Sequence, residues 1–98
     1  MHRIPVGVFG ASGYAGRELC ALINAHPQLE LVYATANAHR GERARLGARD
    51  VTFIATDDAP IAKAEVVFSA LPHGASATWV ERARREGVRA IDLSSDLR

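Results

Sequence analysis

The sequence has few cysteines, no long apolar run and little net charge, and each of these absences excludes a class of protein. It holds one cysteine among 98 residues, which excludes an internal disulfide framework and a multi-cysteine metal site. No apolar run approaches the ~18 residues of a membrane-spanning helix. The formal net charge of +1 gives no general attraction to nucleic acid or to a membrane. Since no secretory signal is visible before the first apolar run, we expect a cytoplasmic protein without nucleic-acid or membrane partners.

The residues that could suggest a catalytic or metal centre have simpler interpretations. Cys20 lies beside Leu19 on a predicted helix, where a small buried hydrophobe is the expected role. A nucleophile would need a neighbouring base and a lowered pKa, and the nearby sequence supplies neither. The adjacent Asp57 and Asp58 have no third ligand beside them, so we interpret them as helix caps. We predict no metal site and no catalytic residue in this chain.

A glycine-rich turn is the most informative feature that the chain does have. Gly10, Gly13 and Gly16 follow the apolar run at residues 4–9 and precede a helical pattern. Such glycines let the backbone turn tightly, approach a pyrophosphate and pack the helix against the strand. The free N–H groups and the macrodipole at the helix start then favour an anion. The pattern predicts a dinucleotide-binding turn, and a turn without a ligand is the alternative.

The rest of the chain alternates between apolar segments and helical patterns. Pro27 ends the first helix, whose outer face is expected to carry Arg17, Glu18 and Asn24. The other predicted elements are strands at residues 29–34, 51–56, 65–71 and 88–93 and helices at residues 57–64 and 75–86. Together they predict an α/β fold, a Rossmann-like doubly wound parallel sheet in three layers with strand order 3-2-1-4-5.

The end of the second predicted strand indicates which dinucleotide is preferred. An Asp or Glu there would bind the ribose 2′-hydroxyl of NAD, but this chain has Thr35, Ala36 and Asn37. The cationic residues 39–45 lack strand periodicity and are predicted to form a loop. Arg40 is the first of these cations and can clamp a 2′-phosphate, so the pattern favours NADP. A solvated basic loop is the alternative, and RNA binding is disfavoured because no aromatic residues lie between the arginines.

The carboxyl ends of later strands complete the predicted site. In an open α/β sheet ligands bind outside that edge, so Leu71, Pro72 and His73 should lie across the cofactor from the glycine turn. Cofactor contact or loop anchoring is the expected role of His73, since proton transfer needs a substrate within reach. The predicted cofactor contacts are Gly10, Ser12, Gly13, Tyr14, Ala15, Gly16, Thr35, Asn37, Arg40, Leu71, Pro72, His73 and Ser94.

Three motifs, taken in order, resemble one enzyme family. They lie at residues 10–16, at residues 70–74 with Ser76, and at residues 91–98. Together they resemble the N-terminal domain of the N-acetyl-γ-glutamyl-phosphate reductases. The paralogous reductase of aminoadipate-route lysine biosynthesis has very similar motifs and is an alternative. The chain departs from the family pattern at Leu97, where Phe is usual, and in the shorter stretch between residues 40 and 51.

The resemblance implies an NADPH-dependent reduction of an acyl phosphate to a semialdehyde in arginine biosynthesis. It implies a full-length protein that is homo-oligomeric, with a cysteine thioester and an acid–base histidine in a later domain. Cys20 and His73 match neither of those residues. We therefore expect residues 1–98 to form one NADP-binding domain that is inactive alone. A stand-alone nucleotide-binding module is the competing expectation, because fold does not determine function.

Overall fold

The computed structural model describes residues 3–94, which alternate between strands and helices. The strands are β1 (Ile4–Phe9), β2 (Leu29–Ala34), β3 (Arg43–Leu46), β4 (Arg49–Thr52), β5 (Val66–Ser69) and β6 (Arg89–Asp92). The α-helices are α1 (Tyr14–Ala25) and α2 (His73–Arg85), and the 3-10 helices are η1 (Asn37–His39), η2 (Thr56–Asp58) and η3 (Ile61–Lys63). No helix among these residues is long and apolar enough to cross a membrane.

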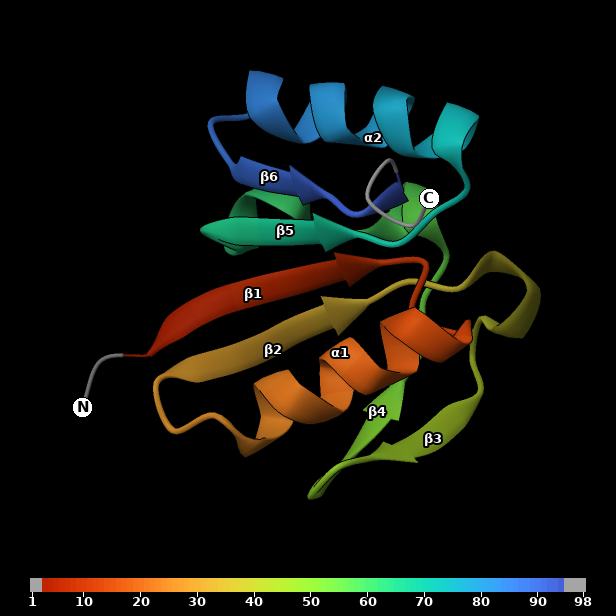
Figure 1. Ribbon diagram of the computed structural model, residues 1–98, viewed down its shortest axis with the longest axis vertical. Coiled ribbons are helices and arrows are strands. Elements are labelled where there is room, and N and C mark those ends of the chain that lie inside the picture. The colour runs from red at the N-terminus through yellow and green to blue at the C-terminus, as the bar shows by residue number, and fades with distance from the viewer. Residues whose placement is uncertain (1–2, 95–98) are drawn as a thin grey trace.

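Four parallel strands form the main sheet, in the order β2-β1-β5-β6. Their arrows point the same way in Figure 1, so the β1–α1 turn, the end of β2 and the β5–α2 turn all lie at one edge. The units β1-α1-β2 and β5-α2-β6 each connect a central strand to an outer one, on opposite sides of the sheet centre. Right-handed crossovers therefore place α1 and α2 on opposite faces. The predicted Rossmann-like α/β class is confirmed.

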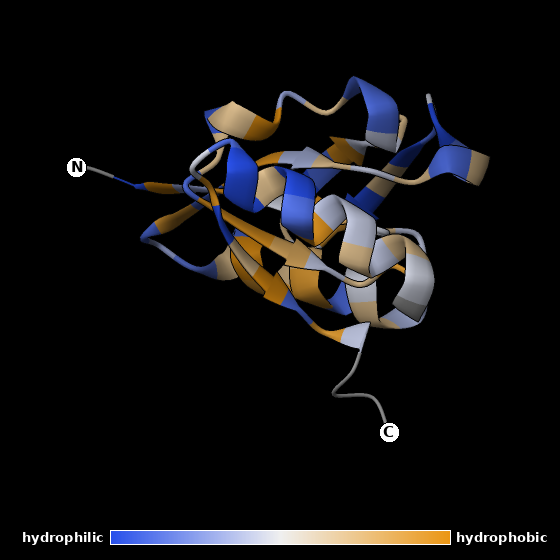
Figure 2. Cartoon of the chain, turned by 90° about the horizontal axis from the view of Figure 1, so that it is seen from above, coloured by the Kyte–Doolittle hydropathy of each residue, from blue (hydrophilic) through white to orange (hydrophobic). Residues whose placement is uncertain are grey.

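Two separate apolar cores match the two faces of the sheet. One holds Val6, Val8, Cys20, Ile23, Leu46 and Phe53, and the other holds Phe9, Tyr33, Val67, Val80 and Ala83. Seen from above, the strands of the main sheet carry the most hydrophobic colours, while the last turns of α2 are hydrophilic (Figure 2). Helix, sheet and helix thus form the three predicted layers, with β1 contributing side chains to both cores.

The predicted third strand, residues 51–56, is not a strand of the main sheet. Only a single parallel bridge, between Thr35 and Ile54, forms beside β2 where that strand was expected. Residues 43–52 instead form the antiparallel hairpin β3–β4, which turns at Gly47 with a φ of 69°. In β3 the buried Leu46 and half-buried Ala44 alternate with exposed arginines. The prediction of a loop at residues 39–45 was therefore wrong for residues 43–45, which belong to β3, because the charge of the arginines obscured this period-two pattern.

Two further expectations need correction. The predicted helix at residues 57–64 is broken into η2 and η3, and neither has a side-chain cap, so Asp57 and Asp58 do not act as caps. Pro60 explains the break, since it forces the preceding Ala59 into extended backbone, with ψ 127°. Helix α2 begins at His73, earlier than predicted, with Pro72 as its N-cap. Of the motif at residues 91–98, residues 95–98, including Leu97, lie outside the described residues.

Candidate nucleotide-binding site

The predicted glycine turn joins β1 to α1 and contacts the turn that follows β5. Gly10 has a φ of 76°, a conformation that favours glycine. A Cβ at Gly10 would lie 3.0 Å from the backbone of Ala70 and Leu71. The amide of Ala70 also donates a 2.8 Å hydrogen bond to the carbonyl of Phe9. Leu71 therefore lies next to the glycine turn at the carboxyl edge of the sheet.

Gly16 and Gly13 serve different purposes in this turn. A Cβ at Gly16 would clash with the carbonyl oxygen of Gly10 and with the backbone of Ala11, so Gly16 is required by the packing of α1 against the turn. A Cβ at Gly13 would meet nothing within 4 Å. Its φ of −74° and ψ of 171° are open to other residues. The protein's own packing therefore does not require glycine at position 13, whereas close approach of a ligand would.

The start of α1, next to Gly13, carries backbone donors without a helical partner. The amide of Arg17 donates the first bond of the helix, 2.9 Å to the carbonyl of Gly13. The N–H groups of Tyr14, Ala15 and Gly16 consequently have no partner within the helix. No side chain caps the helix, and its first turn holds no acidic residue. Tyr14 is 83% exposed beside these donors. The arrangement suits an anionic group.

Thr35, a predicted cofactor contact, holds the turn from inside the protein. Its side chain is fully buried, and its hydroxyl oxygen accepts hydrogen bonds from the Gly10 amide (3.2 Å) and the Thr56 hydroxyl (3.0 Å). Its carbonyl oxygen accepts a 2.7 Å bond from the Ala11 amide. Thr35 therefore acts as a positioning residue for the turn, a role that its sequence position does not indicate.

Asn37 and Arg40 lie just beyond the end of β2 and are both exposed. The side-chain oxygen of Asn37 accepts a 2.8 Å bond from the Thr56 amide, and its carbonyl accepts a 2.9 Å bond from the Arg40 guanidinium. Arg40 borders an open groove that Phe53 and Ala55 also line. Glu42, the acidic residue of this segment, forms a 3.2 Å pair with His39. Arg40 thus places a cation at the edge of the sheet where the adenosine ribose is expected, and Asp58 lines the same groove.

Arg17 is the residue whose placement differs most from the expected outer face of α1. It is half-buried, its Nε donates a 2.8 Å hydrogen bond to the Ser12 carbonyl, and its Cζ lies 5.4 Å from the centre of the Phe53 ring. Helical side chains lean toward the N-terminus of the helix, which brings this guanidinium back to the glycine turn. That lean was the signal available in the sequence, since Arg17 follows Gly13 by about one helical turn.

A hydroxyl and carboxylate cluster joins α2 to the end of β6. The hydroxyls of Ser69 and Ser76 lie 2.7 Å apart, and Ser76 donates a 2.7 Å bond to Asp92. The amide and hydroxyl of Ser94 donate to the same carboxylate oxygen at 2.9 and 2.7 Å. Ser94 is thereby fixed, half-buried, at the carboxyl edge of the sheet. Helix α2 begins at His73, so this residue lies at the same edge.

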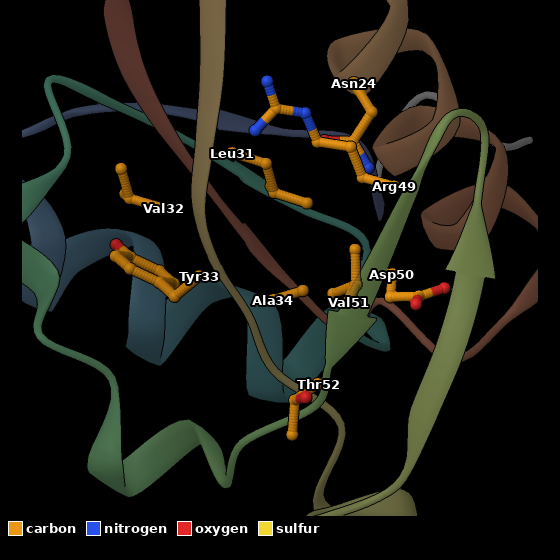
Figure 3. Close-up of a pocket in the computed structure, with 9 residues that line it drawn as sticks. All are labelled: Asn24, Leu31, Val32, Tyr33, Ala34, Arg49, Asp50, Val51 and Thr52. Atoms are coloured by element: carbon orange, nitrogen blue, oxygen red, sulfur yellow. The ribbon is translucent and has the colours of Figure 1, made fainter.

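A different hollow, of about 200 Å³, lies between β2 and β4. Leu31 and Ala34 of β2 reach toward Val51 of β4 there, with Arg49 and Asn24 at one end (Figure 3). None of the predicted cofactor contacts lines it. Nor do the described residues contain a group of three or more side chains able to hold a metal ion.

Cys20 is the expected buried hydrophobe. It is fully buried in the core under α1 and forms no disulfide. Burial raises the pKa of the thiol from its ordinary 9.0 to about 12, although the nearby Arg17 charge works in the opposite direction. At neutral pH the thiol is therefore protonated and is a poor nucleophile.

A doubly wound sheet with a glycine turn at its carboxyl edge defines this chain as a nucleotide-binding domain of the Rossmann-like class. Residues 5–98 match the family described as "Semialdehyde dehydrogenase, NAD binding domain", and the chain belongs to that family.

Relatives with the name N-acetyl-gamma-glutamyl-phosphate reductase resemble almost the entire chain. The protein from Salinispora tropica is 45% identical over 100 residues, which cover 97% of this chain and 30% of that protein. The one from Methanosphaera stadtmanae is 41% identical and covers 100% of this chain and 30% of the relative. The chain thus spans about three-tenths of the length of the curated relatives that it matches.

Solved structures of similar fold include a probable aspartate-semialdehyde dehydrogenase from Pseudomonas aeruginosa, with a TM-score of 0.81 and 27% identity. That match covers 99% of this chain and 30% of the other. Aspartate semialdehyde dehydrogenase with NADP from Candida albicans has a TM-score of 0.76 at 18% identity, covering 92% of this chain and 29% of the other. At that identity the second likeness concerns the fold alone.

Proposed function

We propose that this chain is the NADP(H)-binding domain of an acyl-phosphate reductase of the N-acetyl-γ-glutamyl-phosphate type. The observation that carries the proposal is the open space at Gly13, where a Cβ would meet no protein atom within 4 Å. A glycine that the fold does not need stands at the donor-rich start of α1. This geometry fits a pyrophosphate that approaches the backbone closely.

The preference for NADP over NAD rests on the end of β2. Among residues 35–41 no carboxylate is present to bind a 2′-hydroxyl or repel a 2′-phosphate, and Arg40 lies exposed there. A guanidinium at that position suits a 2′-phosphate, which it can bind through charge-assisted hydrogen bonds. When bound, the dinucleotide supplies a hydride to the reaction.

The reaction itself would take place with residues beyond this chain. The matched relatives are about three times as long, and the one described thiol here is buried and protonated at neutral pH. This domain would bind and orient the cofactor, while a later domain would supply the thioester nucleophile and the acid–base histidine that the family resemblance implies. The substrate would be an acyl phosphate, and assembly into a homo-oligomer belongs to the same proposal.

Calorimetric titration of the chain with NADPH, NADH and 5′-AMP tests the proposal. We expect NADPH to bind more tightly than NADH, and both more tightly than 5′-AMP, which lacks a pyrophosphate. A folded chain that binds neither dinucleotide would contradict the proposal and favour a module with another function.

A further inference from the structure

We infer that Arg17 is a second cation for the 2′-phosphate of the dinucleotide and therefore a specificity-determining residue. The inference rests on the proposed function, since it concerns the same site. It starts from where the guanidinium lies, between the glycine turn and the segment that flanks the end of β2. Its Nε is fixed on the Ser12 carbonyl at 2.8 Å, and its Cζ lies 5.4 Å from the Phe53 ring centre.

Phe53 connects this guanidinium to Arg40. Its carbonyl accepts a 2.7 Å hydrogen bond from the amide of Gly41, the residue that follows Arg40. Phe53 is 1% exposed and packs in the core, so its ring forms a fixed support for Arg17. The next residue, Ile54, pairs with Thr35 just past the end of β2. Phe53 thus contacts Arg17 through its ring. Through its backbone it also holds the segment that carries Arg40.

Most of the hydrogen-bonding capacity of Arg17 is not used within the described part of the chain. Of its five N–H donors, the one on Nε is bound to Ser12, and no carboxylate of residues 3–94 forms an ion pair with it. A guanidinium whose terminal nitrogens are free and whose orientation is already fixed loses little conformational freedom when it binds a phosphate. The 2′-phosphate is the anion expected beside the end of β2, whereas the pyrophosphate belongs over the start of α1.

The test compares the binding of NADP⁺ and NAD⁺ to the chain and to four variants by calorimetric titration. Arg17→Ala should weaken NADP⁺ binding by ~10-fold or more, the usual effect of losing a charge-assisted contact, and leave NAD⁺ binding within about twofold. Arg17→Lys should recover part of the loss, because it keeps the charge but not the planar fork. Phe53→Leu should lower NADP⁺ affinity less than Arg17→Ala, because it removes only the support.

Arg85→Ala is the matched control, since it removes one exposed arginine from the last turn of α2 and should leave both affinities unchanged. Far-ultraviolet circular dichroism checks that each variant is folded. Equal weakening of both cofactors by Arg17→Ala would overturn the inference, because it would place Arg17 on the pyrophosphate. Unchanged NADP⁺ affinity would overturn it as well. A wild-type chain that binds neither cofactor would overturn the proposed function itself. This outcome is distinct from failure of the inference, which is seen only when a variant is compared with a wild type that binds.

Discussion

At the scale of single residues, the glycines of the β1–α1 turn divide the tasks of folding and binding. Gly10 and Gly16 are constrained by protein atoms, whereas Gly13 has open space around its Cα. A substitution at Gly13 therefore tests ligand approach separately from folding. The sequence placed the three glycines at the junction of a strand and a helix and predicted turning, ligand approach and helix packing for them. Which protein atoms constrain Gly10 and Gly16 depends on neighbours that only the folded chain brings close.

Gly13→Val should abolish dinucleotide binding while the fold persists. The valine side chain would occupy the space over the N–H groups of α1, and its backbone at φ −74° is free of strain. Titration with NADPH and a thermal unfolding curve are the two measurements. Gly16→Ala is the contrasting variant and should lower the unfolding temperature, because its Cβ clashes with the Gly10 carbonyl. Undiminished binding by Gly13→Val would remove the main support for the proposed site.

Thr35→Val should destabilise the protein by about 1–3 kcal/mol, the usual cost of leaving buried donors unsatisfied. Valine has the shape of threonine but cannot accept hydrogen bonds from the Gly10 amide and the Thr56 hydroxyl. Denaturant unfolding measures the change. Thr52→Val, at an exposed position of β4, is the control and should have little effect on the free energy of unfolding. Equal effects of the two substitutions would refute the positioning role.

Arg40→Ala should weaken NADP binding by roughly 10- to 150-fold, the equivalent of about 1.5–3 kcal/mol, and leave NAD binding unchanged. The effect should exceed that of Arg43→Ala or Arg45→Ala, because those arginines lie on β3 and Arg45 pairs with Asp50 at 3.5 Å. Titration of the three variants with both cofactors makes the comparison. Unchanged NADP affinity would move the phosphate site away from Arg40.

At the scale of elements, the sequence predicted the strands whose hydrophobic pattern is long. It did not predict the strands whose pattern is short or interrupted by charged residues. β1 and β2 have the predicted bounds because each is a mostly apolar segment between clear turn signals. The hairpin β3–β4 was missed because its inner face is only Ala44, Leu46 and the half-buried Val51. Likewise, the position of Arg17 one turn after Gly13 indicated that it leans toward the glycine turn, but its contact with Phe53 could not be predicted, since Phe53 is remote in the chain.

Gly47→Ala should lower the unfolding temperature more than Gly41→Ala. Both glycines have positive φ, 69° and 86°, so both substitutions carry the same kind of backbone strain. Only at Gly47 would the new Cβ also press on the protein, 2.9 Å from the carbonyl oxygen of Ala21 in α1. The difference between the two melting temperatures measures how firmly the hairpin packs on α1. Identical values would mean that this contact is loose.

At the scale of the whole molecule, the chain spans about three-tenths of its relatives' length and its thiol, Cys20, is buried. We expect no NADPH-dependent reduction of N-acetyl-γ-glutamyl phosphate by the 98-residue chain, measured as loss of absorbance at the nicotinamide band. The fully buried Cys20, with its pKa of about 12, should also resist alkylation until the protein is unfolded. Turnover that disappears in Cys20→Ala would show that this thiol, contrary to its burial, is a nucleophile.

The central place of β1 in the sheet affects how the domain forms during synthesis. β1 emerges from the ribosome first, yet one of its two neighbours, β5, begins only at Val66. Until then β1 can pair only with β2, and Gly10 lacks the Ala70 and Leu71 backbone on which it packs. A nascent chain that stops short of β5 would therefore have the glycine motif without a finished site. Nucleotide binding by ribosome-held chains of increasing length would consequently begin only after the β5–α2 turn has emerged.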